Sequence, residues 1–181
     1  MKLKFREDKA TEAAALFLNL RGGQMSYLKL IKLLYFAERE ALLRWRRPIT
    51  FDSCVSMDHG PALSQTLNLL NGDIEIKGIW QKAISPPANY EVSLLKDPGA
   101  QSLSEAEEAL IREIFGRYGK MSRWEIRNLS HDLPEWKDPQ GSSLPIDYVD
   151  ILKAGGKTKR EITSILEEME NMALMDARMG H

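Results

Sequence analysis

The sequence predicts a mainly α-helical fold: a compact multi-helix domain around a buried central helix, with a small antiparallel β-hairpin or three-stranded sheet. The run Ser26–Glu40 is apolar around most of a helical circumference, which is typical of a helix in the middle of a domain. Three S/T-x-x-E motifs, beginning at Ser104, Ser122 and Thr158, precede apolar residues at helical spacing. We therefore expect residues 1–181 to form one domain that is dominated by helices.

The first half of the chain is expected to contain three helices. The first is an alanine-rich helix around Asp8–Leu20, and the central helix runs from about Ser26 to Arg46. Lys29 and Lys32 interrupt the central helix, so burial requires their ammonium groups either to extend to solvent or to be paired. A third helix is expected from Pro61 to Leu70, because proline suits the first turn of a helix.

The middle of the chain is expected to form the β-structure. Two runs, Ile79–Ile84 and Tyr90–Leu95, flank the turn-forming residues Ser85–Asn89 and predict a β-hairpin with a five-residue connection. An extended piece near Ser53–Met57 is a candidate for a third strand. Since an isolated hairpin is marginally stable in water, we expect this sheet to pack on the helices.

The second half is expected to return to helices. The S/T-x-x-E motif at Ser104 is a capping box, which predicts the start of an amphipathic helix that ends at Gly119. The capping box at Thr158 predicts the start of the last helix. A short helix between them is expected to begin near Pro145 and to end at Gly155.

The composition argues against several classes of partner. The 181 residues carry a net charge of −1 and the pI is about 6.3, so no overall positive field attracts nucleic acid or an anionic membrane. Cys54 is the single cysteine, which rules out an intramolecular disulfide. The first residues lack the apolar segment of a signal peptide, and no stretch reaches the ~18 apolar residues of a membrane span. The sequence therefore predicts a cytoplasmic protein.

Few residues offer catalytic chemistry. One hypothesis joins His59, His131, Glu135 and Glu38 in a metal or acid–base site. The spacing does not support it, because there is no HExxH motif and no second histidine four residues on. Cys54 has no neighbours in the sequence that would lower its pKa, and no G-x-S-x-G motif is present. We therefore expect no catalytic residue, no metal and no cofactor.

Two segments offer binding chemistry. The segment Lys120–Asn128 mixes cations with Trp124, as a nucleic-acid recognition helix can. An ordinary amphipathic helix, with Trp124 facing inward and Arg123 and Arg127 outward, explains it equally, and the net charge favours this second interpretation. The C-terminal helix carries several methionines, which either belong to the core or form an adaptable protein-binding surface. These are Met169, Met172, Met175 and Met179.

Several stretches of the chain stand in an order that is similar to a known family. They are Tyr27–Glu40, Pro48–Asp52, Met57–Ser64, Leu103–Glu107 and Ser130–Trp136. Together they resemble the Panacea domain, a family that includes the SocA-like antitoxins and many phage-associated GepA-like proteins. The similarity extends from about residue 8 to residue 170, and the most specific part is the combination of Lys29–Tyr35 with His59-Gly60-Pro61.

This resemblance implies a compact, mainly helical antitoxin that neutralises a cognate protein toxin, encoded nearby, by direct binding. SocA is similar but also delivers its toxin to the ClpXP protease, so a proteolytic adaptor is an alternative. A metal-assisted hydrolase that uses His59, His131 and Glu135 is a further alternative. The family brings no settled catalytic residues, so the resemblance implies a protein that is not an enzyme.

The partner-binding residues are expected near the central helix, the His-Gly-Pro turn and the Ser-His-Asp-Leu-Pro-Glu-Trp segment. The candidates are Lys29, Lys32, Tyr35, His59, Gly60, Pro61, His131, Glu135 and Trp136.

Overall fold

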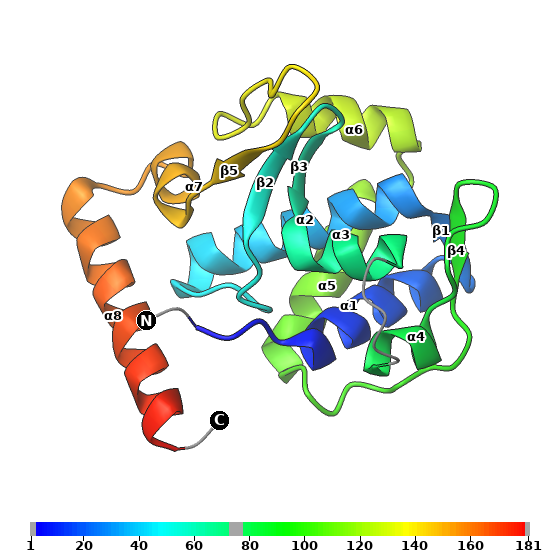
Figure 1. The fold of residues 1–181 in the computed structure, drawn as a ribbon, viewed down its shortest axis with the longest axis horizontal. Coiled ribbons are helices and arrows are strands. Elements are labelled where there is room, and N and C mark those ends of the chain that lie inside the picture. Colours follow the sequence, from blue (N-terminus) through cyan, green and yellow to red (C-terminus); the bar gives the residue numbers. More distant parts are fainter. Residues whose placement is uncertain (1–2, 73–77, 180–181) are drawn as a thin grey trace.

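The computed structural model of the chain describes residues 3–72 and 78–179. Within these ranges the chain forms eight helices (Figure 1), namely α1 (Glu7–Leu20), α2 (Tyr27–Trp45), α3 (Ser64–Asn71), α4 (Ile79–Ala83), α5 (Glu105–Tyr118), α6 (Arg123–His131), α7 (Tyr148–Ala154) and α8 (Lys159–Arg178). The strands are β1 (Gln24–Ser26), β2 (Cys54–Met57), β3 (Gly60–Leu63), β4 (Glu91–Ser93) and β5 (Leu144–Ile146). They form two small antiparallel sheets, β1-β4 and β3-β2-β5. The predicted fold class, mainly helical with a small antiparallel sheet, is confirmed.

Helix α2 is the buried centre of the fold, as predicted. Ser26 caps it by accepting a hydrogen bond from the Lys29 amide, and every residue from Lys29 to Glu38 is buried. Such burial around the whole circumference means that neighbours cover α2 on all sides. Helices α1, α5 and α6 and the β2–β3 hairpin contact it, and Phe36 stacks on Tyr118 of α5 with 4.8 Å between ring centroids.

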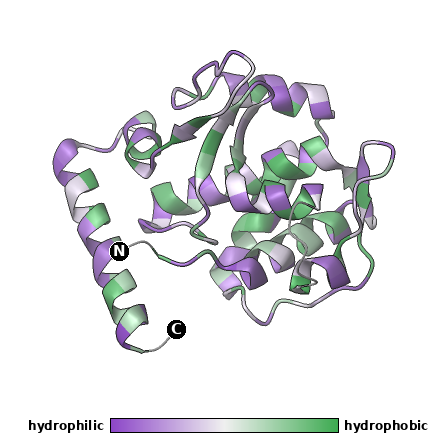
Figure 2. Ribbon diagram, in the orientation of Figure 1, coloured by the Kyte–Doolittle hydropathy of each residue, from purple (hydrophilic) through white to green (hydrophobic). Residues whose placement is uncertain are grey.

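Helix α8 differs from α2 in its distribution of hydropathy. It lies at the side of the molecule and carries hydrophilic and hydrophobic residues along its length (Figures 1 and 2). Its methionines are divided between core and surface: Met169 is buried, Met172 is half-buried, and Met175 and Met179 are exposed. No helix in the described ranges has the length and hydropathy that crossing a membrane requires.

The predicted hairpin of Ile79–Ile84 and Tyr90–Leu95 is wrong. Residues Ile79–Ala83 of the first run form α4, whose buried residues Trp80 and Ala83 stand three apart, and Ile84 follows the helix in an extended conformation. Only the second run forms a strand, β4, and its partner is β1, which lies more than 60 residues earlier in the chain. In the described part of the chain, the two runs are connected as β-structure by an isolated bridge between Ile84 and Leu94.

Both helices that were expected to begin at a proline begin later. Pro61 lies in β3 opposite Ser56 of β2, and α3 starts at Ser64. Pro145 lies in β5, and α7 starts after Asp147. Both prolines lie in edge strands of the three-stranded sheet, where a missing N–H is tolerated. The expected strand near Ser53–Met57 is confirmed as β2, at the centre of that sheet.

The three capping boxes are confirmed. In α5, Ser104 Oγ accepts a hydrogen bond from the Glu107 amide at 3.1 Å, and the Ser104 amide donates to Glu107 at 2.9 Å. The same reciprocal pair is present at Ser122 and at Thr158. Each box satisfies two amides that the first turn of a helix leaves without partners.

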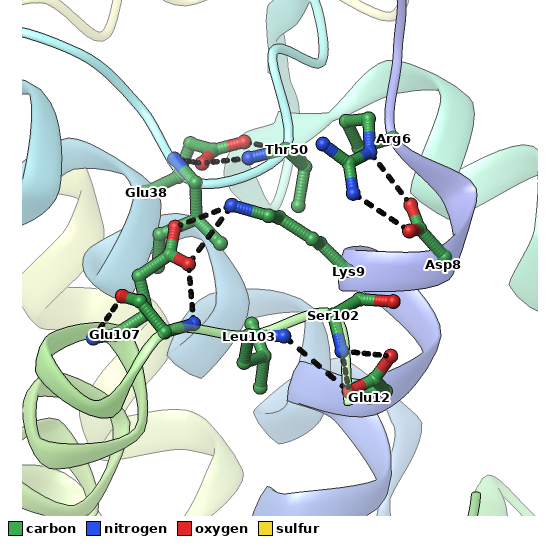
Figure 3. A network of polar contacts seen from close by, with 11 residues as sticks. Arg6, Asp8, Lys9, Glu12, Glu38, Thr50, Ser102, Leu103 and Glu107 are labelled. Carbon is green, nitrogen blue, oxygen red and sulfur yellow. Dashed lines mark hydrogen bonds and ion pairs between the residues drawn. The ribbon is translucent and has the colours of Figure 1, made fainter. Parts of the chain in front are cut away.

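Buried carboxylates hold the loops against the helices (Figure 3). Glu12 of α1 accepts a hydrogen bond from the Ser102 amide at 2.9 Å, which fixes the approach to α5. Glu38 of α2 accepts from the Thr50 amide at 2.8 Å and also from the Thr50 hydroxyl. Burial raises the pKa of Glu38 to about 7. These loops therefore depend on side chains of the central helices for their backbone hydrogen bonds.

Candidate functional site

The turn between β2 and β3 is pressed against two helices. Asp58 and His59 connect Met57 to Gly60, which faces it in the sheet. Gly60 has a φ of +103°, and a Cβ atom there would overlap Ser130 Oγ of α6 and lie 3.0 Å from Lys32 Nζ of α2. A glycine is therefore needed at this position for both its conformation and its lack of a side chain.

The two lysines of the central helix end on backbone carbonyls. The Lys32 ammonium donates to the Pro61 carbonyl at 2.6 Å, and the Lys29 ammonium donates to the Gly119 carbonyl at the end of α5. Both lysines are buried, so their ammonium groups do not extend to solvent. Among residues 3–72 and 78–179 neither forms an ion pair with a carboxylate, so the expected pairing takes the form of hydrogen bonds to carbonyls. Burial, followed by the charge of Arg127, lowers the pKa of Lys32 to about 7, and burial also lowers the pKa of Lys29.

Replacing Lys32 with methionine should remove a pH dependence of stability. Between pH 7 and pH 10.5 an unfolded chain keeps the Lys32 proton, whereas the folded protein has released it. Because the unfolded state then binds more protons, the free energy of unfolding of the wild type should rise with pH across this window, by up to ~1.4 kcal/mol per pH unit. Denaturant unfolding at pH 7 and pH 9 measures this rise.

The increase in the free energy of unfolding between pH 7 and pH 9 should be smaller in Lys32→Met than in the wild type. The control Lys120→Met, at an exposed position, should behave as the wild type. Equal rises in the wild type and Lys32→Met would contradict the assignment.

A buried cluster links α2 to the segment after α6. Glu135 accepts a hydrogen bond from the Tyr35 hydroxyl at 2.9 Å and from Arg39 Nε at 2.6 Å. The Glu135 side chain is inaccessible to solvent and that of Arg39 is 15% exposed, so this is a buried ion pair. Burial, and then nearby groups that include Glu135, raises the pKa of Tyr35. The tyrosine is therefore a neutral donor that helps to fix the carboxylate.

Two aromatic side chains, one from the last residue of α6 and one after it, hold the outer side of the turn. His131 Nε2 lies 3.0 Å from the Asp58 carbonyl, and Trp136 Nε1 donates to the Met57 carbonyl at 2.8 Å. The rings of His131 and Trp136 pack together with 4.3 Å between their centroids. Burial lowers the pKa of His131. A neutral His131 imidazole can donate from Nε2 to the carbonyl that it faces.

Next to the turn lies a group of two exposed aromatic side chains and two half-buried arginines, which we call the Trp124 surface: Tyr90, Trp124, Arg123 and Arg127. The Arg123 guanidinium lies 5.0 Å from the Trp124 ring centroid and 5.8 Å from that of Tyr90. Arg127 lies 5.8 Å from the Trp124 ring, and its Nε donates to His59 Nδ1 at 3.2 Å. His59 therefore joins the turn to this surface.

The structure brings most of the expected residues together around the turn. Lys29 is the exception, since its ammonium points to the end of α5. The residues that gather are Lys32, Tyr35, His59, Gly60, Pro61, His131, Glu135 and Trp136. Of these, His59 is exposed, and His131 and Trp136 are half-buried. The others are buried, so they position the turn and do not themselves offer a surface.

Some residues of the site were not found by sequence reasoning. Arg39, the ion-pair partner of Glu135, was missed because the two lie 96 residues apart in the chain. Trp124 was expected to face inward, but it is 50% exposed. The spacing of Arg123 and Arg127 around Trp124 was a usable signal, since residues four apart share a helical face. Tyr90 gave no signal, because its place depends on a distant strand pairing.

The structure offers little to the hydrolase alternative. In the parts of the chain that are described, no three His, Cys, Asp or Glu side chains gather as metal ligands would. A cavity of about 620 Å³ lies elsewhere, between β2, β5, α7 and α8, and Asp52 and Cys54 line it. Asp52 caps α3 by accepting from the Thr66 amide at 2.8 Å, and burial raises the pKa of the Cys54 thiol well above its usual value. Neither group is an activated nucleophile.

Comparison with known proteins places these features in a family. No curated protein and no solved structure matches the chain. The family described as antitoxin SocA-like, Panacea domain, matches residues 30–137, which is more than half of the chain. The matched region begins in α2, includes the β2–β3 turn and α6, and ends next to Trp136. The chain therefore belongs to the SocA-like antitoxin family that is defined by the Panacea domain.

Proposed function

We propose that the protein is the antitoxin of a toxin–antitoxin pair and that it neutralises its toxin by direct binding in the cytoplasm, with residues 1–181 acting as one domain. The observation that carries this proposal is the family match, which includes most of α2 and the whole of the turn and α6. The toxin would be a protein encoded in a neighbouring reading frame. The proposed role is not enzymatic.

The turn and its surroundings support binding by a preformed surface. The Pro61, Asp58 and Met57 carbonyls each have a side-chain partner, supplied by α2, by the end of α6 and by the segment after α6 respectively. A surface held in this way has little conformational freedom to lose on association, which favours affinity. A stable complex needs ~800 Å² on each partner. The exposed His59 and the half-buried Trp136 would then lie within the contact.

The test is coexpression with the product of the neighbouring reading frame. We expect that product alone to arrest growth, and coexpression of this protein to restore growth and to give a complex that copurifies. A harmless neighbouring product, or two products that do not copurify, would contradict the proposal.

The proteolytic-adaptor alternative makes a different prediction in the same strain. If the protein delivers the toxin to a ClpXP-type protease, the half-life of the toxin should shorten in its presence and lengthen when the protease is deleted. Under direct neutralisation, growth is restored while the toxin persists, with or without the protease.

A further inference from the structure

We propose that the Trp124 surface is the part of the protein that docks on its partner, and that the docked region of the partner is an acidic protein surface. This inference rests on the proposed function, since it names the contact face and the chemistry of the same partner. Trp, Tyr and Arg are the residue types that dominate binding energy in protein interfaces. Here they form one cluster on α6 and the turn before β4.

The aromatic rings of this cluster are exposed although they are large. Trp124 is 50% and Tyr90 is 69% exposed, whereas Trp80 of α4 is 2% exposed. The Arg123 guanidinium lies between the two exposed rings, at 5.0 and 5.8 Å from their centroids. Stacked in this way, the arginine and both rings are arranged before any partner arrives, so less side-chain entropy is lost on binding.

The two arginines of the cluster lack an acidic partner. In residues 3–72 and 78–179, neither Arg123 nor Arg127 forms an ion pair, whereas Arg39, Arg44 and Arg117 each do. The hydrogen bonds of Arg127 go to neutral groups, at 3.2 Å to His59 and 3.3 Å to the Asn128 side chain. Guanidinium N–H groups are therefore left for a partner, and a carboxylate matches their planar geometry.

The positive character of this surface comes from Arg123 and Arg127, which are half-buried on α6. Although the chain as a whole carries a net charge of −1, these two guanidinium groups therefore present positive charge on this side of α6. An acidic surface on the partner would be attracted to it, which raises the association rate and favours one orientation.

The backbone at Tyr90 indicates that its exposure is not incidental. Ala88 and Glu91 pair across a two-residue turn in which Asn89 and Tyr90 both have positive φ, at 54° and 65°. Glycine usually takes the second position of such a turn, because a bulky residue there is strained. Burial of the Tyr90 ring does not offset the energetic cost of this strain, because the residue is 69% exposed. The Arg123 guanidinium lies 5.8 Å from the centroid of the Tyr90 ring, and strained residues of this kind cluster at functional sites.

Acidic residues beside the cluster favour a protein over a nucleic acid as the partner. Glu91 follows Tyr90 directly, and Glu125 lies between Trp124 and Arg127 in α6; both are exposed. A nucleic acid carries a phosphate charge every few ångströms, so its backbone would have to pass these carboxylates. A protein can place single carboxylates on Arg123 and Arg127 and avoid the two glutamates.

The first experiment measures binding of the neighbouring gene product to purified full-length variants. We expect Trp124→Ala to weaken binding by ~30-fold or more, as for a central interface residue, and Arg123→Glu with Arg127→Glu to abolish it. Arg123→Lys should weaken binding less than Arg123→Glu, because it keeps the charge. The matched controls, Met175→Ala and Arg112→Glu at other exposed positions, should bind as the wild type. Circular dichroism and thermal unfolding confirm that each variant is folded.

The outcomes separate this inference from the proposed function. If the neighbouring product binds all variants equally, the Trp124 surface is not the docking face, and the proposed function stands. If the product does not bind even the wild type, the proposed function fails. A second experiment then decides the inference, with a photoreactive amino acid at position 124 in the native host and the same group at position 175 as control.

In the second experiment, a protein cross-linked from position 124 but not from 175 supports the inference under two conditions. Its cross-linked peptide must be rich in aspartate and glutamate, and the complex must weaken with salt. Cross-linked nucleic acid, a neutral or basic peptide, or no product beyond the control overturns it.

Discussion

Replacing Gly60 with alanine should lower the free energy of unfolding by about 3 kcal/mol. Part of this loss is the conformational cost of ~1–2 kcal/mol for a side chain at positive φ, here +103°. The rest is overpacking, ~1–3 kcal/mol, because the new Cβ would overlap Ser130 Oγ. Ser130 cannot move away cheaply, since it is fully buried and its hydroxyl donates to the Arg127 carbonyl at 2.6 Å. Equilibrium denaturation in urea measures the loss.

Gly22→Ala is the matched control for this prediction. Gly22 has a similar φ of +94°, but no atom lies within 4 Å of the position that its Cβ would take. Its replacement should show the conformational cost without the overpacking. Equal losses at both positions would contradict the close contact of the turn with α6.

Replacing Glu135 with alanine should lower the free energy of unfolding by ~3–5 kcal/mol, because it breaks a buried ion pair. The change leaves the Arg39 guanidinium, whose side chain is 15% exposed, without its carboxylate, and the Tyr35 hydroxyl without its acceptor. By contrast, Glu113→Ala removes a carboxylate that pairs with Arg44 and Arg117 at the surface. The loss of stability in that control should be far smaller, because solvent screens an exposed ion pair.

A double-mutant comparison tests whether the cost at Glu135 arises from its partners. In a chain that already carries Tyr35→Phe and Arg39→Met, the same Glu135→Ala change should cost much less, because no donor is left unpaired. An unchanged cost in that background would show that Glu135 contributes mainly by filling space.

The elements that could be predicted are those that local sequence determines. The capping boxes at Ser104, Ser122 and Thr158 involve residues three apart, so the sequence alone contains both partners. Strand pairing is not local. Val92 of β4 pairs with Met25 of β1, and nothing near Val92 in the sequence indicates that partner. The error at Ile79–Ile84 has the same origin, since a short apolar run fits a strand or a buried helix equally.

In the candidate site, too, local patterns could be found in the sequence, whereas contacts between distant segments could not be predicted. The stretch from Lys29 to Tyr35 and the His59-Gly60-Pro61 turn were found together through family resemblance, and the structure gives the physical reason for their association: Lys32 donates to the Pro61 carbonyl. Which of these residues remain accessible could not be predicted, because burial depends on how α6 packs. The exposure of Trp124 is the clearest case, since an aromatic residue on an amphipathic helix normally faces the core.

We propose that the protein acts by holding a toxin in a complex. The most direct measurement titrates the purified toxin from the neighbouring reading frame with the purified protein, in the absence of any protease, and follows both binding and toxin activity. We expect a stoichiometric complex and a loss of toxin activity that follows its formation. The Trp124→Ala variant should need a higher concentration to bind and inhibit the toxin. A toxin that does not bind, or that stays fully active when bound, would contradict the account.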